Sequence, residues 1–192
     1  MKISPEKLDE LIKIVHLAGI EIIKIYKKKV TKKYKSDNTP VTNADIRAND
    51  IICKGLKLHF PEISIVSEEQ VKKGKAAKKF WLVDPLDGTK EFLKGNGEFT
   101  VNIGLIENKK PVFGIIYMPT KNKLYFTKDK KSYFSKLSKK GQLSNIRKIK
   151  VKKRNKNIVI LSRSHSLAKS EIEKAKKKIF QRFNADKIIR SG

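Results

Sequence analysis

The chain has 192 residues, of which 46 are Lys or Arg and 19 are Asp or Glu, so its net charge is +27; 39% of the residues are hydrophobic. This length is typical of one domain with a hydrophobic core. The single cysteine, Cys53, excludes an internal disulfide, and no stretch reaches the about 20 uncharged apolar residues of a membrane-spanning helix. Because the first residues lead into a charged amphipathic segment, we expect an intracellular, cytoplasmic protein.

Apolar spacing predicts two helices near the N-terminus. Ser4 can cap a helix that begins at Pro5 and runs to about Tyr26, and a second helix follows Asp45 and ends before Pro61. Two short strands, each followed by acidic residues, are expected next at 63–66 and 80–83. The rest of the chain is predicted to contain an antiparallel meander of three strands at 99–106, 112–118 and 123–126, followed by a basic loop. A buried strand at 158–161, a helix at 170–183 and the start of a last strand at 187–189 come after this loop.

The positive charge is mostly lysine and is spread along the chain. From Lys128 to Arg190 there are 22 Lys or Arg and only four acids, a balance that is often found in nucleic-acid binders. Base readout, however, draws on arginine, and base stacking needs aromatic residues, which make up 8% of this chain. We therefore expect no specific nucleic-acid partner, while steering of anionic ligands and peripheral association with an anionic membrane stay open.

The acidic residues are concentrated, since ten of the 19 lie in the range 37–98. Asp84 and Asp87 flank Pro85 directly after the expected strand 80–83. Because proline cannot continue a central ladder, we expect a tight bend that brings the two carboxylates together, and their repulsion is costly unless a cation lies between them. Glu68, with Glu69 beside it, follows the neighbouring expected strand and can complete the coordination.

The residues after the second aspartate predict an anion site. Gly88 permits a backbone conformation that other residues avoid, and Thr89 can cap a short helix whose first amides bind an anion. A hard dication beside a phosphate-sized anion site is typical of metal-assisted phosphate ester hydrolysis. The alternative is a plain turn and a solvated acidic loop. A calcium loop of the EF-hand type is excluded because its alternating oxygen ligands are absent.

The string from Phe80 to Phe92, with Ser67-Glu68-Glu69 before it, resembles the lithium-sensitive, magnesium-dependent phosphomonoesterases of the inositol monophosphatase superfamily. Within the superfamily, the CysQ-type 3′(2′),5′-bisphosphate nucleotidases are the most similar, on the strings 37–42 before Asp45, 90–92, 96–103 and 162–165. The resemblance implies an α/β (α+β) fold, a layered α/β/α/β sandwich of the inositol monophosphatase and sugar phosphatase type. It also implies one domain over 1–192, with a metal-binding portion at about 1–130 and the start of a C-terminal α/β portion at about 150–192.

The resemblance further implies the site residues and two or three Mg²⁺ ions. The implied metal ligands are Glu68, Asp84, Asp87 and the backbone carbonyl of Leu86. Asp45 and Thr89 match the pair that orients and deprotonates the attacking water. The resemblance also implies a catalytic role for Glu68. The implied substrate-binding residues are Gly88, Thr89, Glu68 and Asp87.

The implied reaction is hydrolysis of adenosine 3′,5′-bisphosphate, a by-product of sulfur assimilation, to AMP and phosphate; its sulfated form, PAPS, is a second candidate substrate. An inositol monophosphatase or another sugar-phosphate phosphatase is the alternative on the same scaffold. The third hypothesis is an inactive, basic fragment that binds nucleic acid or membrane.

The sequence departs from the family pattern at its end. That pattern continues through a Ser-Gly-Ser-Ser segment to a Trp-Asp motif, which supplies a further metal-binding aspartate. Here Ser191 and Gly192 are the last residues, and the only tryptophan, Trp81, precedes Leu82. The resemblance thus implies a C-terminally truncated member, whose activity depends on whether that aspartate is dispensable. The sequence predicts no oligomeric state.

Overall fold

The computed structural model describes residues 3–28, 32–34, 40–70, 77–151, 158–162, 178, 180, 182 and 187–191. The chain divides into two compact units, Met1–Ile149 and Lys150–Gly192. The first unit contains α1 (Pro5–Tyr26), β1 (Lys32–Tyr34), β2 (Pro40–Thr42), α2 (Asn43–His59), β3 (Ser64–Ser67), β4 (Lys79–Asp87), α3 (Thr89–Lys94), β5 (Thr100–Glu107), β6 (Lys110–Met118), the short 3₁₀ helix η1 (Pro119–Lys121), β7 (Lys123–Lys128), β8 (Lys131–Leu137) and β9 (Leu143–Ile149). In the second unit, β10 (Ile158–Ser162) pairs in parallel with β11 (Lys187–Ser191).

Capping residues mark the starts of the two long helices. The Ser4 hydroxyl accepts a hydrogen bond from the Lys7 amide at 3.3 Å, and Pro5 occupies the first turn of α1, as expected. Helix α2 begins earlier than expected, at Asn43, because Thr42 caps it. No helix in the described part of the chain combines the length and the apolarity needed to cross a membrane.

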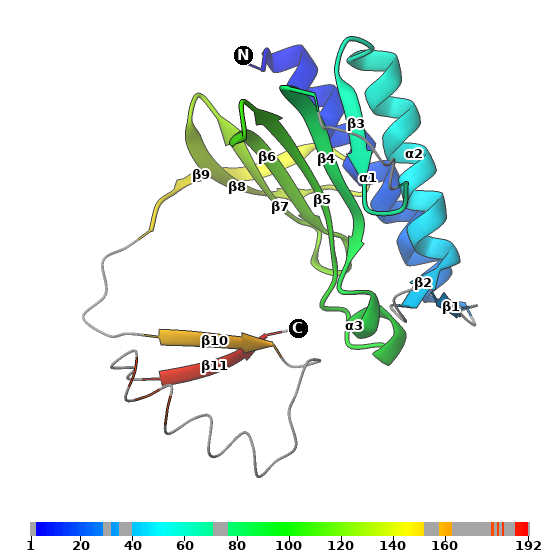
Figure 1. Ribbon diagram of the computed structural model, residues 1–192, viewed down its shortest axis with the longest axis vertical. Coiled ribbons are helices and arrows are strands. Elements are labelled where there is room, and N and C mark those ends of the chain that lie inside the picture. The colour runs from blue at the N-terminus through cyan, green and yellow to red at the C-terminus, as the bar shows by residue number, and fades with distance from the viewer. Residues whose placement is uncertain are drawn as a thin grey trace. The chain divides into compact units, whose positions relative to one another are not determined.

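A seven-stranded sheet, in the order β3-β4-β5-β6-β7-β8-β9, forms the centre of the first unit. Strands β3 and β4 are parallel, whereas every later neighbour is antiparallel, so the expected meander is confirmed. Helices α1 and α2 lie side by side against one face of this sheet (Figure 1). Since Ser67 pairs with Val83, the parallel pairing places the residues that follow both strands at the same end of the sheet.

Aromatic rings pack the helices against the sheet. Phe60, at the end of α2, meets Trp81 of β4 edge to face at 5.1 Å between ring centroids. Tyr26 of α1 packs on Phe92 of α3 at 5.3 Å, and Phe92 packs on Phe99 at 5.2 Å. Phe60, Trp81, Phe92 and Phe99 are almost completely buried, so the short helix α3 is held against the core by its own aromatic side chain.

The sequence predicted a strand at 80–83 that ends before Asp84, but β4 is longer. It continues to Asp87, and its ladder with β5 breaks between Asp84 and Asp87. Pro85 lies within this irregularity, where the missing N–H of proline costs no ladder hydrogen bond. The bend between the two carboxylates is therefore a bulge inside a strand and not a turn after it.

Four strands were not predicted. Strands β1 and β2 lie in the segment expected to be polar coil, and β8 and β9 replace most of the expected basic loop. Strand β9 is exposed along most of its length, and its sequence lacks the apolar alternation that identifies a strand. The helix expected at 170–183 lies outside the described residues, apart from three helical positions at 178, 180 and 182.

We predict that two leucines of α1 differ sharply in their contribution to stability. Leu11 is completely buried, so Leu11→Ala leaves a cavity and is expected to lower the free energy of unfolding by about 2–5 kcal/mol. Leu17 on the same helix is 54% exposed, and Leu17→Ala is expected to change it by less than about 0.5 kcal/mol. Urea unfolding followed by circular dichroism measures both values, and equal losses would contradict the placement of the core.

Candidate active site

Asp45 is a buried carboxylate at the start of α2. Its Oδ2 accepts a hydrogen bond from the Thr42 amide at 2.8 Å and another from the Thr42 hydroxyl. The Thr42 hydroxyl in turn accepts from the Ala44 amide at 3.1 Å, and Thr42 and Asp45 form a capping box in which the side chain of each accepts from the backbone amide of the other. Asp45 is 2% exposed and Thr42 is 1% exposed, so helix capping fixes the carboxylate in one orientation.

The second oxygen of this carboxylate faces Thr89. The Thr89 hydroxyl lies 3.1 Å from Asp45 Oδ1 and 3.2 Å from the carbonyl oxygen of Leu86. Burial raises the pKa of Asp45, and the hydrogen bonds from Thr42 and Thr89 oppose that rise. The structure thus brings together Asp45, Thr89 and Leu86, which the sequence analysis had assigned to one site.

We expected Thr89 to cap the short helix α3, but it does not. Gly88 is the N-cap of α3, Thr89 occupies the first helical position, and no side chain caps this helix. Gly88 has a φ of 94°, and a Cβ atom there would lie 2.8 Å from the carbonyl oxygen of Glu98. Only glycine fits this position, and the resulting turn leaves the Thr89 hydroxyl available to Asp45.

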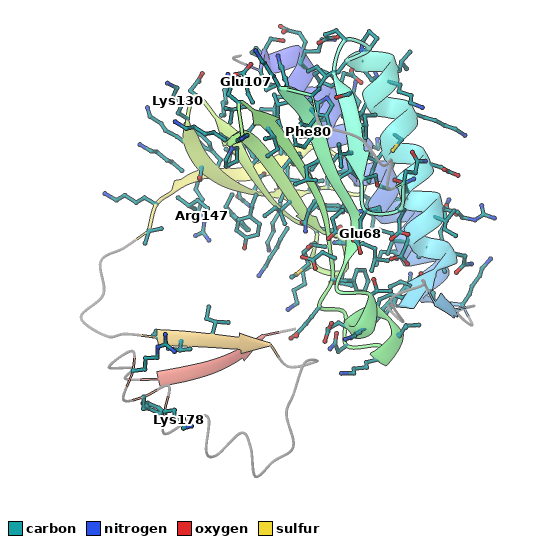
Figure 2. All side chains as sticks on the ribbon, viewed as in Figure 1. Glu68, Phe80, Glu107, Lys130, Arg147 and Lys178 are labelled. Carbon is teal, nitrogen blue, oxygen red and sulfur yellow. The ribbon has the colours of Figure 1, made fainter. Side chains whose placement is uncertain are left out.

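Asp84 lies where β4 departs from regular pairing. Burial first, and then the negative charges of Glu68 and Asp87, raise the pKa of Asp84 to about 8. A protonated Asp84 donates a hydrogen bond to the Glu68 carboxylate. Figure 2 shows Glu68 near α2, at the lower end of the sheet as drawn. The three acids that the sequence analysis assigned to a metal therefore interact with one another.

Asn102 of β5 is a neighbour of this group that the sequence analysis had not given a role. It pairs with Asp84 in the ladder, and its Nδ2 donates to Asp87 Oδ2 at 3.1 Å. Two oxygens here, Oδ1 of Asp84 and Oδ1 of Asn102, are buried without a hydrogen-bond partner in the described part of the protein. Thr42 was also missed, although the spacing of Thr42 and Asp45 is a capping-box signature.

The donor set fits a hard cation. Among the described residues, no three His, Cys, Asp or Glu side chains converge into a finished metal cage. Glu68 and Asp87 nevertheless raise the pKa of Asp84, and the two oxygens named above lack hydrogen-bond partners in the described part of the protein. These observations indicate an excess of negative charge that a divalent cation would neutralise. The oxygen chemistry suits Mg²⁺, and the residues that would hold it are Glu68, Asp84, Asp87 and the Leu86 carbonyl.

Two residues of the strings that carry the resemblance complete the description. Glu91 of α3 is 3% exposed, and its Oε1 is buried without a hydrogen-bond partner in the described part of the protein. His165 lies outside the described residues.

Curated proteins are similar to this chain over most of its length. The chain is 42% identical to the 3′(2′),5′-bisphosphate nucleotidase CysQ of Buchnera aphidicola over 176 residues, which is 88% of this chain and 64% of the relative. It is 38% identical to the enzyme of the same name from Escherichia coli K12 over 164 residues, which is 83% of this chain and 64% of the relative. The chain therefore spans slightly less than two thirds of the length of these curated relatives.

Solved structures and a family model also match this chain. CysQ from Bacteroides thetaiotaomicron matches 95% of this chain and 71% of its own, with 32% identity and a TM-score of 0.69. The suhB protein of Bartonella henselae matches 96% of this chain and 70% of its own, with a TM-score of 0.76 and 24% identity, which confirms the expected α/β sandwich fold class. The model described as "Inositol monophosphatase family" matches residues 5–192. The chain belongs to the inositol monophosphatase family.

Proposed function

We propose that this chain carries a magnesium-dependent phosphomonoesterase site that removes the 3′-phosphate of adenosine 3′,5′-bisphosphate, which gives AMP and phosphate. The observation that carries the proposal is the hydrogen bond from Thr89 to the buried Asp45 carboxylate, beside a group of interacting acids. The substrate class rests on the similarity to relatives named 3′(2′),5′-bisphosphate nucleotidases. PAPS is the second substrate that this similarity implies.

In this proposal, Glu68, Asp84, Asp87 and the Leu86 carbonyl hold Mg²⁺, in the two or three ions that the family resemblance implies. The bound ions would supply Lewis-acid stabilisation of the charge that develops on the phosphoryl and leaving oxygens. The protein contributes by fixing the ligands: Asn102 donates to Asp87, and the backbone amide of Glu68 donates to the Val83 carbonyl at 3.0 Å. Fixed ligands lower the reorganisation needed at the moment of reaction.

In this proposal, Asp45 accepts the proton of the attacking water through the Thr89 hydroxyl. The Thr89 hydroxyl donates to Asp45 Oδ1, so its lone pairs are free to accept a proton from water placed against it. The water oxygen attacks phosphorus, its proton passes through the Thr89 hydroxyl to Asp45, and the bond between phosphorus and the 3′-oxygen breaks. The leaving oxygen then takes a proton from solvent. Burial raises the pKa of Asp45, which favours retention of that proton.

The substrate phosphate is proposed to bind at Gly88 and Thr89, with Glu68 and Asp87 in contact through the metal. We further propose that both compact units form one domain over 1–192, in which about 1–130 binds metal. The resemblance also implies lithium sensitivity, a cytoplasmic location and a role in sulfur metabolism. We propose peripheral binding to anionic membranes on the basis of the net charge of +27 alone.

The metal assignment predicts an opposite effect of one substitution with and without magnesium. In EDTA, native Asp84 keeps a proton up to about pH 8, whereas the unfolded chain releases it near about pH 3.9. The native state therefore binds more protons in this window, and the free energy of unfolding falls as the pH rises through it. Asp84→Asn removes this dependence, so its urea midpoint in EDTA at pH 8 is expected to exceed that of the wild type.

Millimolar Mg²⁺ should reverse this order, because the cation binds only the native wild-type site. We expect it to raise the thermal midpoint of the wild type and to leave that of Asp84→Asn unchanged, as read by differential scanning fluorimetry. Asp50→Asn is the control, since Asp50 is an exposed acid on α2, and it should respond like the wild type. A magnesium shift of equal size in Asp84→Asn would contradict the assignment.

The catalytic assignment predicts that Asp45→Asn lowers turnover of adenosine 3′,5′-bisphosphate by at least about 100-fold, because the proton acceptor is lost. Released phosphate is measured on the 192-residue chain with Mg²⁺, with EDTA and with added Li⁺, and inositol 1-phosphate is run in parallel. Asp50→Asn, on the same helix, should stay within about twofold of the wild type. Lithium-sensitive turnover that needs Mg²⁺ and prefers the nucleotide is the expected result.

Two outcomes would overturn this proposal. Preferred turnover of inositol 1-phosphate would favour a sugar-phosphate phosphatase on the same scaffold. No turnover by a chain that is folded by circular dichroism would mean that these residues do not suffice for catalysis.

A further inference from the structure

Two buried polar residues beside the carboxylates are not used by the proposed reaction. Asn49 lies on α2, one helical turn after Asp45, and is 3% exposed. Ser67 is the last residue of β3, directly before Glu68, and is 2% exposed. The Ser67 hydroxyl donates to Asn49 Oδ1 at 2.6 Å, which joins the helix that carries Asp45 to the strand that carries Glu68.

The Ser67 hydroxyl also takes part in the turn that follows. It lies 3.4 Å from the Glu69 amide, which can donate to it, while the Gln70 amide donates to the Ser67 carbonyl at 3.1 Å. The Glu68 amide donates to Val83, the neighbour of Asp84 on β4. The backbone at Glu68 is thus fixed on two sides, by β4 through its own amide and by α2 through the Ser67 side chain.

We propose that Asn49 and Ser67 are positioning residues: their hydrogen bond sets the place of the Glu68 carboxylate relative to Asp84 and Asp45 and thereby the affinity of the site for a divalent cation. This inference rests on the proposed metal site. A buried bond of this kind restricts the motion of a ligand that stands at the end of an outer strand of the sheet. Loss of such an outer partner typically lowers metal affinity by about 10- to 100-fold.

The chain offers a matched control on the same acceptor. The Cys53 thiol donates to the same Asn49 Oδ1 at 3.4 Å, from the next turn of α2, and Cys53 is 5% exposed. Cys53→Ala removes a buried hydrogen-bond donor from Asn49 but leaves the bond to Ser67 intact. It therefore separates the effect of the bridge from the effect of any change around Asn49.

The test uses Mn²⁺ as a spectroscopic probe of the site in the 192-residue chain, with free Mn²⁺ measured by electron paramagnetic resonance. Ser67→Ala and Asn49→Ala are each expected to weaken Mn²⁺ binding by about tenfold, and the double variant by no more than either single one. Cys53→Ala should stay within about twofold of the wild type. In phosphate-release assays, the single variants should need more Mg²⁺ for half-maximal rate but approach the wild-type rate at saturation.

The possible results separate this inference from the proposed function. Wild-type Mn²⁺ affinity in a folded Ser67→Ala or Asn49→Ala chain would overturn the positioning role and leave the metal site in place. Losses that multiply in the double variant would show two independent effects and would also overturn the bridge. A wild-type chain that binds no Mn²⁺ would overturn both the metal site and this inference. Because the two variants break the bond from opposite sides, either one that folds is sufficient.

Discussion

The Asp45 carboxylate links α2 to the end of the sheet that carries the candidate site. One oxygen accepts the two Thr42 donors that begin α2, and the other accepts the hydroxyl of Thr89, which stands 44 residues later in the chain. A buried charge is costly unless donors surround it, and here both oxygens are satisfied at a helix N-terminus. One side chain therefore connects the start of α2 with the start of α3.

The carboxylates of Glu68, Asp84 and Asp87 represent the opposite situation. Their proximity follows from the parallel pairing of β3 with β4 and from the bulge at Pro85, which are features of the backbone. Without a cation, the arrangement costs free energy, as the raised pKa of Asp84 shows. The aromatic contacts of Trp81 and Phe92 and the buried faces of α1 and α2 stabilise the unit against this local cost.

The fold class could be predicted from the sequence, and the hydrogen bonds among three site residues follow the sequence expectation, whereas several local elements do not. Asp45, Thr89 and the Leu86 carbonyl were expected together, and the structure joins them by hydrogen bonds; the metal and phosphate roles of the site residues remain predictions. Local chemistry was sufficient for α1, where Ser4 and Pro5 act within one turn. It was not sufficient at Thr89, because the left-handed Gly88 takes over the capping position and only the close approach of Glu98 explains that choice.

The missed strands β8 and β9 show where sequence reasoning ends. Strand β9 is mostly exposed, and β8 contributes only Phe134, Ser135 and Leu137 to the buried interior, so the hydrophobic pattern is weak; β8 pairs with β7, and β9 pairs with β8. His16 of α1 illustrates the same point: it is 8% exposed because the turn at Gly141 packs against its ring. A contact between residues 125 positions apart leaves no signal in either local sequence.

The sheet order has a consequence for the path of folding. From β4 to β9 each strand pairs with the next one along the chain, so these ladders close short loops and lose little chain entropy. The contact between Asp45 and Thr89 must close a loop of 44 residues, and it needs the turn at Gly88 already in place. We expect the meander to form early and the carboxylate end of the sheet to assemble late. The part of the molecule that carries the candidate site would then also be the first to open under mild destabilisation.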